Sequence, residues 1–323
     1  MTRAAPAELI AATRRGDRAA LARLLSLVER GGEPARQVGR ALHGLAGDAY
    51  TVGITGAPGA GKSTLTSALI DLLRRRGERV AVLAIDPSSP FTGGAILGDR
   101  VRMGVHTLDD GVFIRSMATR GHLGGLAVAA PEAVRVLTAA GYPWVVLETV
   151  GVGQVEVDVV SQADTTVVVV NPGWGDAVQA SKAGLMEIAD VFVVNKADRP
   201  GADETARDLD RMLDMVAADG WRPPVVAAAA TAGEGVADVW HAVAAHREHQ
   251  VATGELDARR RRRAAEEVTR LVAARLLEQA RAVTAGARAG ELADAVVAGD
   301  IDPWTAADEL LGDVVEGSGA AES

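Results

Sequence analysis

The sequence predicts an α/β fold with a mostly parallel sheet flanked by helices, and with helical segments at both ends of the chain. Between Tyr50 and about His249, short aliphatic runs alternate with helical stretches, which is typical of parallel sheets covered on both faces. A glycine-rich loop follows the first run, and helical periodicity without strands occupies both flanks. We expect a helical extension over 1–45, a central α/β domain over 46–249, a helical dimerisation arm over 250–316 and a disordered tail over 317–323.

Seven aliphatic or β-branched runs are the expected strands of this sheet. They are rich in valine, and most lack the alternation of a half-exposed strand, so we expect them to be buried on both faces. Because ligands on such sheets bind at the carboxyl ends of the strands, the polar motifs that follow the runs are the candidate site residues. The runs cover residues 51–55, 80–85, 112–115, 144–148, 165–170, 191–194 and 225–227.

The loop after the first run has the G-x-x-x-x-G-K-S pattern of a phosphate-binding P-loop, placed between a strand and a helix. Its glycines let successive backbone N–H groups surround a phosphate. Lys62 would neutralise the β- and γ-phosphates, the Ser63 hydroxyl would bind Mg²⁺, and Thr64 would meet the α-phosphate. The fold is therefore that of a P-loop NTPase. The expected nucleotide contacts in this loop are Gly56, Ala57, Pro58, Gly59, Ala60, Gly61, Lys62, Ser63 and Thr64.

A second motif, Asn195-Lys196-Ala197-Asp198, follows another aliphatic run and predicts guanine as the base. Asp198 would accept hydrogen bonds from the ring N1–H and the exocyclic amine, and Lys196 would lie along the ring face. Adenine presents no such pair of donors, so we expect GTP rather than ATP. Ala229, Ala230 and Thr231 occupy the place where a backbone N–H would meet the guanine oxygen, although the usual serine is absent.

Candidate metal ligands and catalytic groups follow other strands. Ser63, Asp86, Asp99 and Glu148 are expected to hold Mg²⁺, directly or through water, although either aspartate could instead cap a helix or a turn. The Gly151 N–H would sense the γ-phosphate, and Gln154 could orient water or simply begin a helix. Arg115 and Arg120 could stabilise transition-state charge or form surface ion pairs. The catalytic candidates are Lys62, Asp86, Asp99, Gln154 and Lys182.

The use of lysine singles out one of these candidates. Of 34 lysines and arginines, only Lys62, Lys182 and Lys196 are lysines, so those that remain are expected where a compact ammonium is needed. We therefore interpret Lys182, within the glycine-rich segment 172–184, as a functional charge in a switch rather than an exposed helix lysine.

Composition limits the remaining possibilities. A net charge of −9 and a pI near 5.3 argue against a nucleic-acid-binding surface, and the absence of cysteine excludes disulfides and thiolate metal sites. No apolar run approaches the ~20 residues of a membrane span, and no signal peptide opens the sequence, so we expect a cytoplasmic protein. The arginine run 259–263 is interpreted as a solvated helix start, and His241, His246 and His249 as helix-surface histidines.

Together these stretches resemble the MeaB/ArgK family, the GTPases associated with methylmalonyl-CoA mutase. The resemblance covers nearly the whole chain, and Asp-Pro-Ser-Ser-Pro from Asp86 and Glu-Thr-Val-Gly-Val-Gly-Gln from Glu148 are its most specific parts. It implies a homodimer that binds Mg²⁺ and GTP, hydrolyses GTP to GDP and phosphate, gates adenosylcobalamin delivery to an acyl-CoA mutase and protects that mutase. It also implies that the region of Lys182 responds to the mutase, and that a cobalamin adenosyltransferase is a candidate partner.

Two other functions are compatible with a P-loop. A nickel-inserting GTPase of the same broad class would need a Cys/His metal cluster, which the sequence lacks. A P-loop kinase acting on a small substrate or a transport protein is disfavoured by the guanine motif. Because no Asp-x-His-x-x-Gly cobalamin motif occurs, we expect the partner, and not this chain, to bind cobalamin.

Overall fold

The computed structural model describes residues 5–45, 47–86, 106, 108–118, 125–149, 162–173, 186–215 and 220–319, with the backbone alone at 86, 118, 125–128 and 313–319. The described chain divides into two compact units, Met1–Arg261 and Arg262–Ser323. The strands are β1 (Tyr50–Gly56), β2 (Val80–Asp86), β3 (Val112–Ala118), β4 (Trp144–Thr149), β5 (Thr165–Val170), β6 (Val191–Asn195) and β7 (Val225–Ala228). The helices are α1 (Pro6–Arg14), α2 (Arg18–Arg30), α3 (Gly32–Leu42), α4 (Lys62–Arg75), α6 (Gly125–Ala139), α9 (Ala202–Met215), α10 (Val236–Thr253), α11 (Glu255–Thr284), α12 (Ala287–Ala298) and α13 (Pro303–Gly319).

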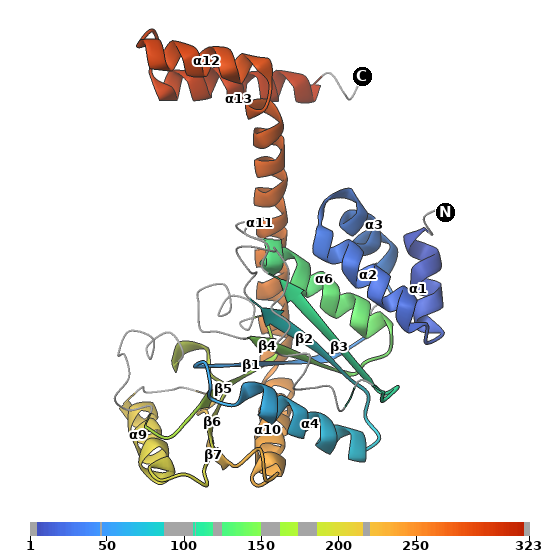
Figure 1. The fold of residues 1–323 in the computed structure, drawn as a ribbon, viewed down its shortest axis with the longest axis vertical. Helices are drawn as coiled ribbons and strands as arrows, with labels where there is room; N and C mark the ends of the chain where they lie inside the picture. The colour runs from blue at the N-terminus through green and yellow to red at the C-terminus, as the bar shows by residue number, and fades with distance from the viewer. Residues whose placement is uncertain are drawn as a thin grey trace. The chain divides into compact units, whose positions relative to one another are not determined.

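The first unit is built on a seven-stranded sheet in the order β3-β2-β4-β1-β5-β6-β7 (Figure 1). Every neighbouring pair is parallel, so the predicted parallel sheet is confirmed. The carboxyl ends of all seven strands therefore lie at one edge. In the centre of the sheet, Ile54 of β1 pairs with Glu148 of β4, and Gly56 pairs with Val169 of β5. This register brings the glycine-rich loop beside the ends of β4 and β5.

Alternate residues of the strands enter separate cores, because side chains along a strand point to opposite faces of the sheet. On one face, Val52, Ile54 and Val146 pack with the buried sides of α4 and α10. On the other face, Leu147 packs with α6, and Phe192 packs with α9. The result is three layers, with helices on both faces of a buried sheet.

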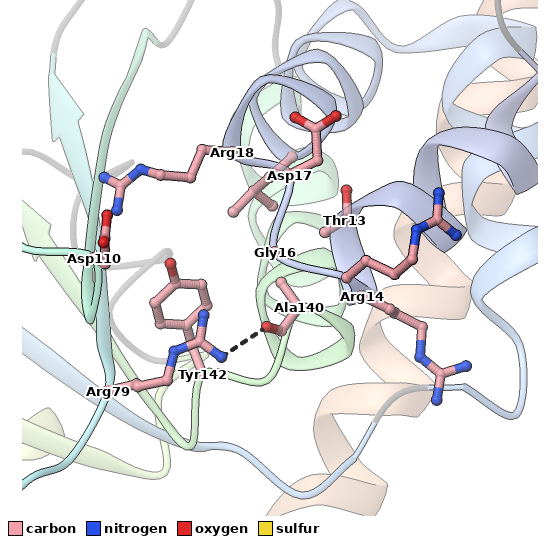
Figure 2. A pocket seen from close by; sticks show the side chains of 11 residues that line it. Thr13, Arg14, Gly16, Asp17, Arg18, Arg79, Asp110, Ala140 and Tyr142 are labelled. Atoms are coloured by element: carbon pink, nitrogen blue, oxygen red, sulfur yellow. Dashed lines mark hydrogen bonds between the residues drawn. The ribbon is translucent and has the colours of Figure 1, made fainter.

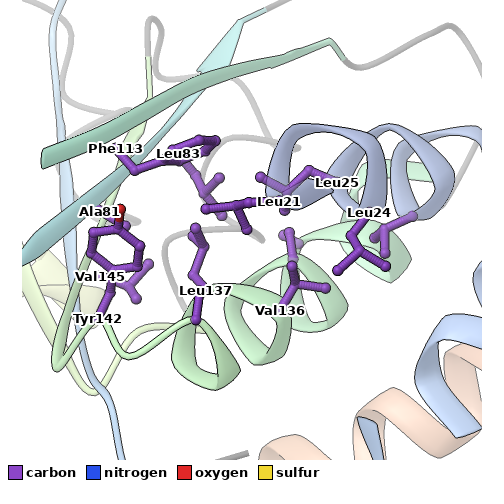
Figure 3. Packing of buried hydrophobic residues seen from close by; sticks show 14 of the residues in the cluster. Leu21, Leu24, Leu25, Ala81, Leu83, Phe113, Val136, Leu137, Tyr142 and Val145 are labelled. Carbon is purple, nitrogen blue, oxygen red and sulfur yellow. The ribbon is translucent and has the colours of Figure 1, made fainter. Parts of the chain in front are cut away.

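Helices α1–α3 extend the core that contains Leu147 and α6. Leu21, Leu24 and Leu25 of α2 are at most 2% exposed and belong to the same cluster as Val136 and Leu137 of α6 (Figure 3). The N-terminal helices are thus packed on α6 and the sheet through one continuous apolar core.

The start of α11 differs from the solvated arginine run that the sequence predicted. Arg259 donates to both carboxylate oxygens of Asp190, at 2.7 and 2.8 Å, and Arg260 donates to both oxygens of Asp164, at 3.2 and 3.0 Å. These arginine side chains are only 22% and 31% exposed. The two aspartates immediately precede β6 and β5 and also accept backbone N–H groups of β5 and β1. The prediction failed because it considered only i,i+4 partners on the same helix.

The interpretation of His246 as a helix-surface residue was also wrong, since its side chain is fully buried. Its Nδ1 shares a 2.8 Å hydrogen bond with the Thr165 hydroxyl, and its Nε2 lies 3.4 Å from Asp190 Oδ1. Burial lowers the pKa of the His246 imidazole, and the nearby Asp190 carboxylate opposes this shift. A polar cluster therefore joins α10 and α11 to the amino-terminal edge of the sheet.

The second unit contains the rest of α11, with α12 and α13 packed on each other. Four aliphatic residues recur at helical spacing along α11 and are 44–60% exposed: Val268, Leu271, Val272 and Leu276. In the part of the chain that is described, no helix combines the length and the apolar character that crossing a membrane requires.

Candidate nucleotide-binding site

The P-loop joins the carboxyl end of β1 to the start of α4. The Lys62 ammonium donates to the carbonyl oxygens of Gly56 and Ala57, at 2.7 and 3.1 Å, and the residue is 6% exposed. Gly56 and Gly61 have φ values of 142° and 94°, where a side chain would be strained. A Cβ at Gly56 would also overlap the carbonyl oxygen of Val169 in β5. The loop therefore holds the ammonium against its own backbone, close to where P-loop N–H groups receive phosphate.

Ser63 and Glu148, two of the predicted magnesium ligands, meet at this edge. The Ser63 hydroxyl donates to Glu148 Oε1 at 2.5 Å, and the two residues are 7% and 0% exposed. Hydroxyl and carboxylate oxygens are ligands that Mg²⁺ prefers, so this pair fits the ion. Asp86 ends β2 at the same edge, but its side chain, and all of Asp99, lie outside the described residues.

Asn195 connects the guanine motif to the P-loop. Its amide nitrogen donates to the Ala60 carbonyl at 2.8 Å, and its amide oxygen accepts the Ala230 N–H at 3.2 Å. Asn195 is 3% exposed, and a Cβ at Gly61 would overlap its side-chain nitrogen. This bridging role was missed from the sequence, although asparagine occurs only at Asn171 and Asn195.

Lys196 and Asp198 follow in a tight turn at the end of β6. Lys196 has a φ of 59°, the one positive value at a non-glycine residue in the described part of the chain. Its ammonium donates to the Gly59 carbonyl at 2.6 Å, so the side chain reaches back to the P-loop. Asp198 is exposed, and its carboxylate is available to the donors of a guanine ring.

The segment Ala229–Thr231 completes this edge. The Ala229 N–H bonds to the Glu234 carbonyl at 3.0 Å, and the Ala230 N–H bonds to Asn195. Two of the three amides proposed for the guanine oxygen are therefore engaged, which makes the amide of the exposed Thr231 the strongest candidate.

Several predicted residues cannot be placed by the structure. Gly151, Gln154 and Lys182 lie outside the described residues. Arg115, one of the two candidate catalytic arginines, forms an ion pair of 2.8 Å with Glu29 of α2. With the two side chains only 20% and 10% exposed, Arg115 is engaged in a largely buried ion pair that joins β3 to α2, and not in the surface ion pair that was the alternative to a catalytic role.

Comparison with known proteins decides the family. The model of the family described as methylmalonyl-CoA mutase-associated GTPase MeaB matches residues 21–285. The chain belongs to the MeaB family. A putative GTPase of Pyrococcus abyssi is 51% identical over 314 residues, covering 96% of this chain and 97% of that protein. GTPase ArgK of Escherichia coli is 40% identical over 271 residues, covering 80% and 81%.

A solved structure supports the same assignment. The crystal structure of a protein titled LAO/AO transport system kinase superimposes with a TM-score of 0.69 at 28% identity, covering 97% of this chain and 99% of that one. This MeaB-family protein is a GTPase, as its relatives are, and the predicted P-loop GTPase fold is confirmed.

Proposed function

We propose that this MeaB-family GTPase couples GTP binding and hydrolysis to adenosylcobalamin loading of an acyl-CoA mutase of the methylmalonyl-CoA type, and that it protects the mutase from inactivation. The observation that carries the proposal is the match over residues 21–285 to a family described by its association with that mutase. The mutase would hold the cobalamin, and a cobalamin adenosyltransferase is a candidate further partner. We place this activity in the cytoplasm.

The contacts at the carboxyl edge support a mechanism for hydrolysis. Lys62, which lies against the Gly56 and Ala57 carbonyls, would turn to the β- and γ-phosphates and spread the charge that develops there. Ser63 and Glu148 would hold Mg²⁺, which neutralises phosphate charge when bound. Asp198 and Lys196 would select guanine, while Asn195 keeps their loop against the P-loop.

The remaining site residues are proposed to complete the site when nucleotide binds. Asp86 and Asp99 would reach the metal or its water shell, Gly151 would donate its N–H to the γ-phosphate, and Gln154 would orient the attacking water. Lys182 would belong to the switch that responds to the mutase, because it is one of only three lysines in the chain.

The test measures GTP hydrolysis by the purified protein with and without candidate adenosylcobalamin-dependent mutases, after each is tested for retention on the immobilised GTPase. We expect slow hydrolysis alone and faster hydrolysis with the client mutase. Lys182→Ala should keep nearly the full affinity for GTP and lose the stimulation, whereas Lys182→Arg reports whether charge alone suffices. If no mutase is retained or alters turnover, the chaperone proposal fails and the GTPase assignment stands.

We also propose that the apolar stripe of α11 packs against a second copy of the chain, because four exposed aliphatic side chains on one helix face favour association. Leu271→Glu should then convert a dimer to a monomer in light scattering. Ala273→Glu is the matched control, since two residues along a helix lie about 200° apart around its axis. A wild-type monomer at micromolar concentration would contradict this proposal.

A further inference from the structure

A pocket of about 530 Å³ lies between the turn that joins α1 to α2 and the residues that precede three strands (Figure 2). One wall comes from residues 13–18, and the other includes Arg79, Asp110 and Tyr142, which lie just before β2, β3 and β4. Because the strands are parallel and the GTP site lies at their carboxyl ends, this pocket lies at the opposite edge of the sheet. It is therefore separate from the P-loop.

The lining of the pocket is strongly basic. Four arginines face two carboxylates, those of Asp17 and Asp110, although the chain as a whole carries a net charge of −9. Asp17 is already engaged as the N-cap of α2, where it accepts the Ala19 and Ala20 N–H groups at 2.8 and 3.0 Å. The arginines are Arg14, Arg15, Arg18 and Arg79.

Two of these arginines are held in place by neutral groups. Arg79 donates to the carbonyls of Ala140 and Gly141, at 3.2 and 3.1 Å, and its guanidinium carbon lies 4.3 Å from the centroid of the Tyr142 ring. Arg18 donates to the Asp109 carbonyl at 3.2 Å. Figure 2 shows the Tyr142 ring between these two guanidinium groups. Carbonyls and ring faces fix a guanidinium without neutralising it.

The absence of ion pairs sets this cluster apart. In the described part of the chain, none of the four pocket arginines forms an ion pair, whereas Arg74 pairs with Asp109 and Arg115 with Glu29. Thr13 lines the same pocket, is 3% exposed, and has a hydroxyl without a hydrogen-bond partner among the described residues. Four guanidinium groups that no described carboxylate pairs with, against two carboxylates in the lining, leave the pocket with a net positive charge.

We propose that this pocket is a second anion site, which binds a small molecule carrying two or more phosphate groups. The planar guanidinium fork matches the geometry of phosphate oxygens, which accept two N–H groups at once. Arg18 and Arg79 form the ordered base of the site, and the exposed Arg14 and Arg15 supply further positive charge from the α1–α2 turn. A pocket of this size accommodates a diphosphate with a small attached group.

The test is calorimetric titration of inorganic pyrophosphate, pre-equilibrated with Mg²⁺, into protein whose P-loop is saturated with Mg·GDP. We expect one additional site per chain. A parallel titration with ADP tests the same diphosphate chemistry: tighter binding than pyrophosphate assigns a nucleotide ligand, and equal binding assigns a ligand recognised by phosphate alone. No saturable heat with either probe would overturn the proposal.

Variants of the lining residues distinguish binding at a defined site from non-specific attraction of phosphate groups to positive charge. Arg14→Gln with Arg15→Gln, both in an exposed turn, should weaken binding severalfold, and Arg18→Gln with Arg79→Gln about tenfold or more. Asp110→Asn should strengthen binding, a gain that a damaged fold would not produce. Arg211→Gln, on the exposed face of α9 where Arg211 pairs with Asp208, is the matched control. Equal effects of Arg211→Gln and the pocket variants would refute the assignment.

Discussion

The ion pair between Arg259 and Asp190 offers the sharpest test of how α11 is joined to the sheet. Arg259→Ala removes two hydrogen bonds to the Asp190 carboxylate and one to the Asp164 carbonyl. Asp190, whose side chain is 9% exposed, would keep the Thr166 N–H and the neighbouring His246. The substitution therefore leaves a buried carboxylate short of its main counter-charge.

The expected loss of unfolding free energy is about 3 kcal/mol. Removing one member of a buried ion pair costs roughly 3–5 kcal/mol, because the remaining charge stays desolvated. The lower end applies here, since the Arg259 side chain is 22% exposed and water can partly replace it. Arg261→Ala is the matched control, because Arg261 lies on the same helix and is exposed. It should change stability by no more than about 0.5 kcal/mol.

The pH dependence adds an independent check through His246. Burial lowers the pKa of His246 below its ordinary 6.5, Asp190 and Glu255 raise it, and Arg259 and His249 lower it further. The unfolded chain thus binds more protons at this residue near pH 6, so the contribution of His246 to stability is fully present above about pH 6.5 and is lost as the pH falls. Without Arg259 the His246 pKa should rise, and a protonated imidazole would then compensate Asp190. The difference between wild type and variant should shrink by about 1 kcal/mol in acid.

The measurement is urea unfolding of the three proteins at one protein concentration, at about pH 8 and about pH 5.5. If Arg259→Ala unfolds like Arg261→Ala, the bidentate ion pair does not contribute in solution, and the argument about α11 is wrong. If the destabilisation is about 3 kcal/mol at both pH values, the ion pair is real but His246 does not respond to it.

Three further predictions concern the GTP site. Gly61→Ala should lower the unfolding free energy by about 2 kcal/mol and should also lower the affinity for GDP, because the new Cβ would meet the Asn195 side chain. An unchanged melting temperature and unchanged GDP binding would contradict this prediction. Asp198→Asn should weaken GDP binding about a hundredfold, because two charge-assisted hydrogen bonds to the base are lost. The variant should instead favour xanthosine diphosphate, whose base presents a carbonyl acceptor where guanine has its exocyclic amine. Equal affinity of wild type and variant for GDP in fluorescence titrations would remove Asp198 from the site. Glu148→Gln keeps the shape of the side chain beside Ser63 but removes its charge. It should therefore reduce the Mg²⁺-dependent part of GTP affinity about tenfold and leave Mg²⁺-free GDP binding intact. Loss of binding in both conditions would indicate a purely structural role for Glu148.

The sequence by itself determined the parallel α/β fold, the P-loop and the guanine motif. In each case the residues of one short continuous stretch are sufficient for the prediction. A run of aliphatic residues must be buried, and a glycine loop between a strand and a helix presents its own N–H groups to phosphate. Asp198 likewise needs no distant partner for the contact with guanine that we propose for its carboxylate.

Only the tertiary structure decided which distant polar groups meet. Ser63 and Glu148 are 85 residues apart, Asn195 and Ala60 are 135 apart, and Arg259 and Asp190 are 69 apart. Hydrophobic periodicity says that a strand is buried but not which strand lies beside it, so it cannot pair side chains across the sheet. The same limit explains why Arg259 and His246 were assigned to solvent. A charged or polar residue on a helix is buried only when another element supplies its partner, and strand order determines where that element lies.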